Sequence, residues 1–200
     1  MQRSAWRGLA AAALLGLATA CVSASNPYVD ASAAETARFK LVAVPLPSGT
    51  SFLLSQGPFG ANTHHDPGES YKWDLDVPFG TPVVAVQAGT VLSVWEASTG
   101  GGCDPRFNES PHNVKVLHAD GTVAQYAHVA SRVRPGDVVA RGQVIAVTAL
   151  NGFLCEPQLC FSVYASREEM HGTSAPRNLP LRFAGIDGEL LREGTRYTAP

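Results

Sequence analysis

The sequence predicts an all-β fold, either a sandwich or a curved antiparallel sheet. Residues 82–95, 113–129 and 137–149 are short segments rich in β-branched residues, and Gly, Pro and Asp punctuate the chain around them. No segment of helical length carries apolar residues at a sustained 3.6-residue period with capping residues at its ends. Strands joined by tight turns are therefore expected to make up the domain.

The segment 113–129 predicts a β-hairpin. Val114 and Val116 alternate with their neighbours before an Asp-Gly pair at 120–121, and β-branched residues resume after it. An Asp-Gly pair between two such runs is a strong signal for the two-residue turn of a β-hairpin.

Residues 100–111 interrupt the strand pattern. The stretch reads GGGCDPRFNESP and shows no apolar period, so it is expected to form a long loop. Long loops within compact domains often border functional sites.

The N-terminus predicts a signal peptide over residues 1–20. A short basic region precedes an apolar run from Leu9 to Ala20, which is too short to span a bilayer of about 30 Å and ends in small residues. A buried N-terminal helix is the structural alternative.

The residues around the expected cleavage site indicate a lipoprotein. The string LATAC, ending at Cys21, resembles a bacterial lipobox, although Ala18 stands where Leu is usual. We therefore expect an exported, periplasmic protein that a lipidated Cys21 anchors to a membrane, with soluble secretion as the alternative.

The remainder of the chain divides into three parts. Residues 21–40 are rich in Ser and Ala and are expected to form a flexible tether, residues 41–166 the β domain, and residues 167–200 a loop-rich C-terminal extension. The net charge of −2 and the absence of a basic run beyond the extreme N-terminus argue against a nucleic acid partner.

Several side chains have the chemistry of zinc ligands. Imidazole, carboxylate and thiol groups all bind this metal. The candidates are His64, His65, Asp74, Asp76, His128 and Cys160. On residue type alone, a pair such as His64 and His65 in a polar stretch is more often part of a solvated loop than a metal site.

The order of motifs along the chain resembles a known family. The stretch from Tyr71, YKWDLDVPFGTPVVAVQAGTV, is similar to the zinc-ligand segment of the M23 peptidases, also called LytM or lysostaphin-like. This resemblance implies the LytM fold, a duplicated hybrid motif, and places Asp74 at the metal-binding aspartate. It places His65 at the first metal-binding histidine, with His64 as the adjacent alternative.

Two downstream motifs extend the resemblance. QYAHV is similar to the family's YAHL and puts His128 at a catalytic histidine that helps to stabilise the transition state. RVRPGDVVARGQVIAVTALNG looks like the glycine-punctuated segment that follows in the family.

The last motif departs from the family. Where the family has PHLHF, this chain has PQLCF over residues 157–161. Gln158 therefore takes the place of the catalytic base, and Cys160 that of the third zinc ligand. Positions two apart on a strand share a face, so both side chains can reach one site.

The two replacements have different consequences. A thiolate is a competent zinc ligand, so His65, Asp74 and Cys160 are the expected metal set, with zinc as the possible cofactor. An amide cannot accept and return a proton, and general acid-base assistance is typically worth about 10²–10⁴-fold in rate. The expected catalytic positions are thus His128 and Gln158, the second impaired.

The remaining cysteines are expected to form one disulfide. In the family the loops that carry Cys103 and Cys155 border the groove, so the resemblance favours a bond between them that leaves Cys160 free. A bond between Cys155 and Cys160, or a buried unligated Cys160, stays open.

The resemblance implies a domain that acts on or near peptidoglycan. The first hypothesis is a catalytically impaired module that binds the cell wall or a cell-wall hydrolase. The alternative is an active zinc endopeptidase with a cysteine ligand. A biotinyl or lipoyl carrier is disfavoured because none of the three lysines, Lys40, Lys72 and Lys115, lies in an exposed hairpin turn.

Overall fold

The computed structural model describes residues 25–65, 68–107, 111–167, 170 and 177–200. The expected signal peptide and Cys21 lie outside these residues. Within the described ranges, no helix is long and apolar enough to cross a membrane.

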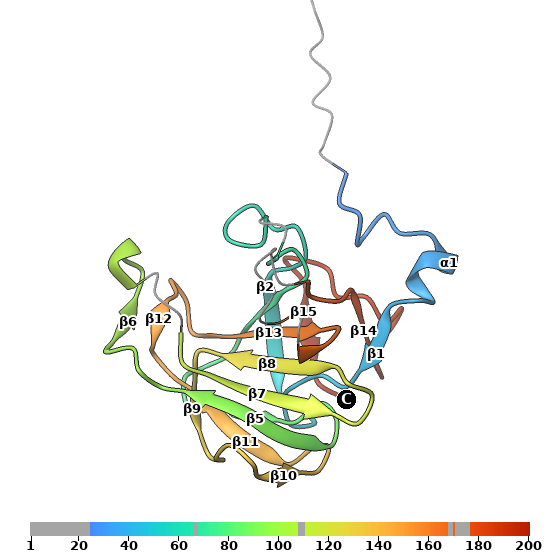
Figure 1. Ribbon diagram of the computed structural model, residues 1–200. Coiled ribbons are helices and arrows are strands. Elements are labelled where there is room, and N and C mark those ends of the chain that lie inside the picture. Colours follow the sequence, from blue (N-terminus) through green and yellow to red (C-terminus); the bar gives the residue numbers. More distant parts are fainter. Residues whose placement is uncertain (1–24, 66–67, 108–110, 168–169, 171–176) are drawn as a thin grey trace, which may run out of the picture.

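The fold is nearly all β, as the sequence predicts, and is organised around one eight-stranded antiparallel sheet (Figure 1). In sheet order its strands are β10 (Val138–Val139), β5 (Gly89–Trp95), β7 (Asn113–His118), β8 (Val123–Ala127), β13 (Gln158–Tyr164), β3 (Trp73–Asp76), β2 (Ser51–Gln56) and β15 (Arg196–Thr198). The expected hairpin is confirmed as β7 and β8, with Gly121 at a φ of 85° in the turn. Such a positive φ suits glycine, which has no Cβ.

Three smaller sheets complete the domain. A three-stranded antiparallel sheet contains β4 (Pro82–Val84), β11 (Val144–Thr148) and β9 (Val129–Ser131). Two parallel pairs join β1 (Lys40–Val42) to β14 (Leu181–Phe183), and β6 (Gly101–Gly102) to β12 (Gly152–Phe153). In Figure 1 the pair of β6 and β12 lies on the opposite side of the domain from β1 and α1 (Ala33–Thr36).

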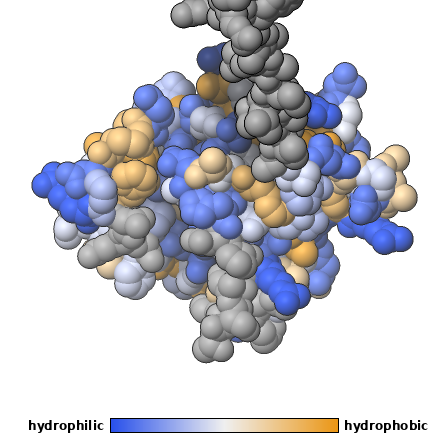
Figure 2. Space-filling view, turned by 90° about the horizontal axis from the view of Figure 1, so that it is seen from above, coloured by the Kyte–Doolittle hydropathy of each residue, from blue (hydrophilic) through white to orange (hydrophobic). Residues whose placement is uncertain are grey.

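Alternation along two central strands separates the core from the opposite face of the sheet. Leu159, Phe161 and Val163 of β13, with Trp73 and Leu75 of β3, belong to the main hydrophobic core. The residues between them therefore face the other side of the sheet, because side chains alternate along a strand. On the face of the molecule seen in Figure 2, polar and apolar residues are interspersed.

Residues 25–40 are not simply the solvated tether that their composition predicts. Tyr28 is fully buried, its hydroxyl donates to the Leu181 carbonyl at 3.0 Å, and its ring lies 5.7 Å from that of Phe39 and 5.8 Å from that of Trp73. Ser32 caps the short helix α1 in a reciprocal capping box. One aromatic anchor thus joins a Ser- and Ala-rich segment to the core.

The C-terminal segment is also part of the domain. It is rich in loops, as expected, but β14 pairs with β1 and β15 extends the main sheet beyond β2. Leu181, Phe183 and Leu191 enter the hydrophobic core. Residues 177–200 therefore contribute to the stability of the whole fold.

Replacing Tyr28 by alanine should measure how firmly the N-terminal segment is held. Loss of a buried aromatic ring typically costs about 3–5 kcal/mol, so Tyr28→Ala should lower the free energy of unfolding by that order in urea denaturation. Tyr28→Phe removes only the hydroxyl and should cost about 0.5–1.5 kcal/mol. A Tyr28→Ala protein as stable as the wild type would show that this segment is a tether after all.

Candidate metal centre

The centre begins with a cross-strand pair in the main sheet. Asp74 of β3 lies directly opposite Cys160 of β13 in the antiparallel register. Both face away from the core, and directly opposed residues have Cβ atoms about 4.5–5.5 Å apart. Period-2 alternation together with this register brings the carboxylate and the thiol to one point.

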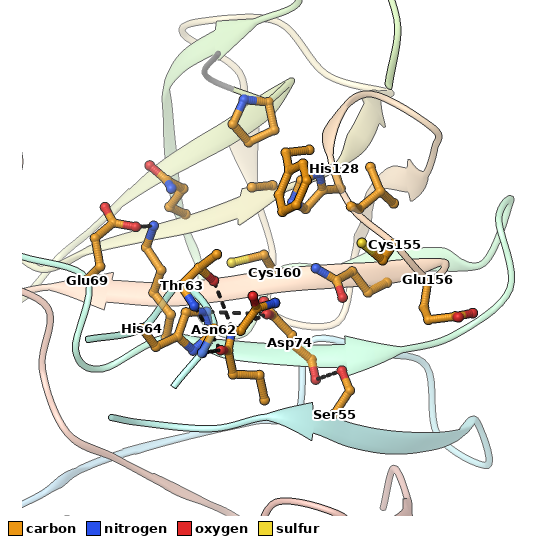
Figure 3. A pocket seen from close by; sticks show the side chains of 18 of the residues that line it. Ser55, Asn62, Thr63, His64, Glu69, Asp74, His128, Cys155, Glu156 and Cys160 are labelled. Carbon is orange, nitrogen blue, oxygen red and sulfur yellow. Dashed lines mark hydrogen bonds and ion pairs between the residues drawn. The ribbon is translucent and has the colours of Figure 1, made fainter. Parts of the chain in front are cut away.

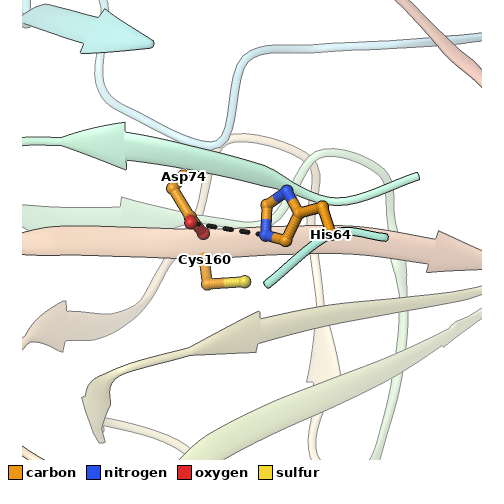
Figure 4. Close-up of side chains that lie close together, drawn as sticks. All are labelled: His64, Asp74 and Cys160. Atoms are coloured by element: carbon orange, nitrogen blue, oxygen red, sulfur yellow. Dashed lines mark ion pairs between the residues drawn. The ribbon is translucent and has the colours of Figure 1, made fainter. Parts of the chain in front are cut away.

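A loop after β2 adds an imidazole to the pair. His64 is 1% exposed, and its Nε2 lies 3.3 Å from Asp74 Oδ2. One potential ligand atom from each of His64, Asp74 and Cys160 lies within 4.8 Å of the other two (Figure 4).

The tautomer of His64 can be read from its second nitrogen. Nδ1 lies 3.0 Å from the carbonyl oxygen of Gly57. A carbonyl can only accept, so Nδ1 carries the proton in this bond. Nε2 therefore faces the Asp74 carboxylate: when protonated it donates to Oδ2, and when it has lost that proton it is free to bind a metal ion.

Asp74 is a buried carboxylate with spare coordination capacity. Burial pushes its pKa up, but hydrogen bonds and charge from His64, with further bonds from the Cys160 thiol and Gln56, outweigh burial and lower the pKa overall. Gln56 Nε2 donates to Oδ2 at 2.9 Å, whereas Oδ1 has no hydrogen-bond partner in the described part of the chain.

Cys160 is buried and forms no disulfide. Burial raises the pKa of its thiol well above the ordinary value, and the charge of Asp74 raises it further. A metal ion would reverse this preference, because coordination deprotonates a thiol. Imidazole, carboxylate and thiol, with an unpartnered carboxylate oxygen among them, form a donor set that fits zinc.

The geometry selects His64 where the expected ligand set had His65. The side chain of His65 is exposed, and it does not line the groove that contains Asp74 and Cys160. His64 is turned inward because Gly57 accepts its Nδ1 proton and because Gln56 Oε1 accepts from the backbone of the same loop at 2.9 Å. Sequence spacing could not separate two adjacent histidines, and metal binding by either stays a prediction.

His128 lies on the same groove, held by its backbone and by its ring. It follows β8 directly and has a φ of 61°, unusual for a residue with a Cβ. Its N–H donates to the His112 carbonyl at 3.0 Å, and its Nδ1–H donates to the Asn151 carbonyl at 2.8 Å. Burial lowers its pKa, with partial offset from Asn151 and Asp74, so the neutral ring is favoured and Nε2 is left without a proton.

The expected convergence of the site residues is confirmed for four of the five positions. Asp74, His128, Gln158 and Cys160 line one groove of about 690 Å³, and His65 does not (Figure 3). Two contributors were missed at the level of sequence. Asn151 orients His128, and Gln56 holds both Asp74 and the His64 loop. Neither carries a local signal, since each acts through a neighbour distant in sequence.

The expected disulfide is confirmed. Cys103 and Cys155 are bonded, with Cα atoms 4.2 Å apart, and Cys160 remains free. The alternative bond between Cys155 and Cys160 is therefore wrong. The disulfide joins the 100–107 segment to a groove wall that includes Phe153, Leu154 and Cys155.

The sequence was compared with known protein families and matches one of them. Residues 69–172 match the sequence profile of peptidase family M23. No curated protein matches the chain.

Several solved structures are similar to this chain. Lysostaphin is 23% identical over 64% of this chain and 47% of its own, with a TM-score of 0.45, so the match spans about half of that protein. The lysostaphin catalytic domain from Staphylococcus simulans is 24% identical over 64% of this chain and 87% of its own, with a TM-score of 0.44. A chain of the SpoIIQ-SpoIIIAH pore-forming complex is 19% identical over 70% of this chain and 89% of its own, with a TM-score of 0.47.

Zinc should stabilise the purified protein through His64 and not through His65. At a free zinc concentration of about 100 times Kd, binding adds about 2.7 kcal/mol, or roughly 5–10 °C in Tm at about 2–4 °C per kcal/mol. His64→Ala should abolish the Tm shift, and His65→Ala should leave it intact. The reverse pattern would restore the original ligand assignment.

Cobalt substitution tests the thiolate separately. Cobalt-loaded wild type should show a thiolate-to-cobalt charge-transfer band, and Cys160→Ser should lose the band. A wild-type cobalt spectrum without the band would exclude Cys160 from the coordination shell.

Proposed function

Because the chain belongs to peptidase family M23, we propose that it is a cell-envelope domain that binds a cell-wall peptide or a wall hydrolase and has little or no hydrolytic activity. The observation that carries this proposal is the amide of Gln158 at the position of the expected proton acceptor. The proposal includes export and anchoring through a lipidated Cys21, on the strength of the lipobox-like string LATAC.

His64, Asp74 and Cys160 would hold the metal. When bound, zinc polarises a carbonyl oxygen and lowers the pKa of a water ligand. A thiolate donates more charge than a neutral imidazole, so a centre with Cys160 is expected to be a weaker Lewis acid than one with a histidine in its place.

The groove has the groups for binding a peptide bond but lacks an evident base. His128, with Nδ1 fixed by Asn151, presents Nε2 to a bound carbonyl or water. Gln158 can donate or accept a hydrogen bond in the same groove but cannot take up a proton.

The acidic residues at the two ends of the groove are directed elsewhere. Glu69 forms an ion pair with Lys72, and the carboxylate of Glu156 points away from the cluster of His64 and Asp74 (Figure 3). Glu193, which also lines the groove, accepts from the Gly57 N–H at 3.2 Å. These three carboxylates are thus engaged or directed away from the cluster.

One observation favours the alternative of an active endopeptidase. Asp76 lies opposite Gln158 in the register between β3 and β13, where a carboxylate could take up the proton that an amide cannot. Its Oδ1 accepts from Ser55, and burial raises its pKa. If the wild type hydrolyses muropeptides and Asp76→Asn abolishes this activity, the alternative is correct.

We expect the purified mature domain to show no detectable cleavage of muropeptides in a chromatographic digestion assay. Loss of general acid-base assistance alone lowers the rate by about 10²–10⁴-fold. Robust wild-type hydrolysis that a chelator abolishes would contradict the proposal and show that a cysteine-ligated metal suffices.

Restoring the two family residues should be synergistic. Gln158→His supplies a base without changing the metal, and Cys160→His changes the metal's acidity without supplying a base. The double variant should gain more than the product of the two single gains, because residues that act as a unit are non-additive. Independent effects in the digestion assay would show that the two positions do not share one reaction.

A further inference from the structure

Two lysines line the groove that contains the candidate metal centre. Asp74, Cys160, Ala127 and Asn113 form one continuous cross-strand row through β3, β13, β8 and β7. The neighbouring row on the same face contains Ser162, Gln125 and Lys115. Lys72 precedes Asp74 by two positions, just before β3 begins, and lines the same groove. Residues two apart on a strand are separated by about 6.6 Å.

The charge of Lys115 has no counter-ion in the described part of the chain. Lys115 is half-buried, lines the groove and forms no hydrogen bond or ion pair with any described residue. Burial, and after it the charge of Lys72, lowers its pKa, so the two ammonium groups are within electrostatic range of each other. A partly desolvated cation beside a second cation is stabilised by an anion between them.

Lys72 retains donors for such an anion. It pairs with Glu69, which lies at the end of the groove opposite Glu156 (Figure 3). An ammonium has three N–H donors, so the bond to Glu69 leaves two. Gln125 lines the groove in the same row and offers an amide donor as well.

We propose that Lys72 and Lys115 form an anion-binding subsite that holds a carboxylate of a peptide bound beside the metal centre. This inference rests on the proposed function and narrows its ligand to peptides that carry a free carboxylate. Given the spacing of the rows, the carboxylate lies within about two residues of the group at the metal centre, since an extended chain rises about 3.3 Å per residue.

The test compares two forms of one peptide. A synthetic wall stem pentapeptide with its carboxylates free, and the same peptide with every carboxylate converted to an amide, are titrated into the zinc-loaded full chain by calorimetry. The wild type should bind the free acid about tenfold more tightly, the effect of one charge-assisted hydrogen bond. Lys115→Gln should remove this preference with zinc content unchanged.

Two control variants bracket the result. Lys115→Arg keeps the charge and should retain most of the preference. Arg134→Gln removes an exposed cation that does not line the groove, and should retain all of it. Loss of the preference in Arg134→Gln would attribute it to net charge and overturn the subsite.

The remaining outcomes separate the subsite from the proposed function. If both peptide forms bind the wild type equally, the subsite is wrong and peptide binding stands. If neither form binds, both are wrong. Competition with inorganic phosphate and with acetate identifies the anion, because a groove that prefers phosphate to acetate in displacing the peptide is not a carboxylate subsite.

Discussion

Asp74 places a carboxylate on a strand whose neighbouring side chains, Trp73 and Leu75, belong to the hydrophobic core. A buried charge without partners is strongly destabilising, by about 3–5 kcal/mol when a partner is removed. The chain compensates it from two directions. Gln56 at the end of β2 and His64 in the loop after it reach the carboxylate from one side, and Cys160 faces it across the sheet. These contacts hold the loop that contains His64 against the groove. If the loop moved away, the Asp74 carboxylate would lose its contact with His64.

The contacts to the Asp74 carboxylate leave one of its oxygens without a partner in the described part of the chain, and this oxygen is available to a metal ion. The oxygen is Oδ1, and His64 turns Nε2 toward the carboxylate, where this nitrogen can bind a metal once it has lost its proton. Gln158 lies on the same groove, two residues before Cys160. Binding of a metal depends on the residue at position 160, and transfer of a proton depends on the residue at position 158. The Cys160 thiol has the chemistry of a zinc ligand, whereas the Gln158 amide cannot take up a proton. The proposal of a binding domain with little hydrolytic activity rests on this pair of residues.

Acidic and basic side chains both line the groove. The acidic Asp74 belongs to the candidate metal centre, and two cationic residues line the same groove, Lys72 just before β3 and Lys115 on β7. One wall is tied to the 100–107 segment by the Cys103 to Cys155 disulfide, and the floor is the continuous sheet. A rigid floor with a constrained wall reduces the ordering cost of binding.

Local patterns in the sequence determined the all-β class, the hairpin around Gly121, and the shared face of Gln158 and Cys160. Each depends on neighbours a few residues apart, through period-2 alternation or turn chemistry. Motif order determined the positions of Asp74 and His128 in the groove, and with them the expected site.

Only the tertiary structure decided the rest. His64 and His65 are adjacent and chemically identical, and the choice between them depends on a carbonyl at Gly57 and on burial. Tyr28 stands in a Ser- and Ala-rich segment, so its role depends on the distant rings of Phe39 and Trp73. Lys72 and Lys115 are far apart in the sequence, and only the fold brings both to one groove. These are contacts between residues far apart in the chain, and local periodicity carries no information about which distant partner a side chain meets.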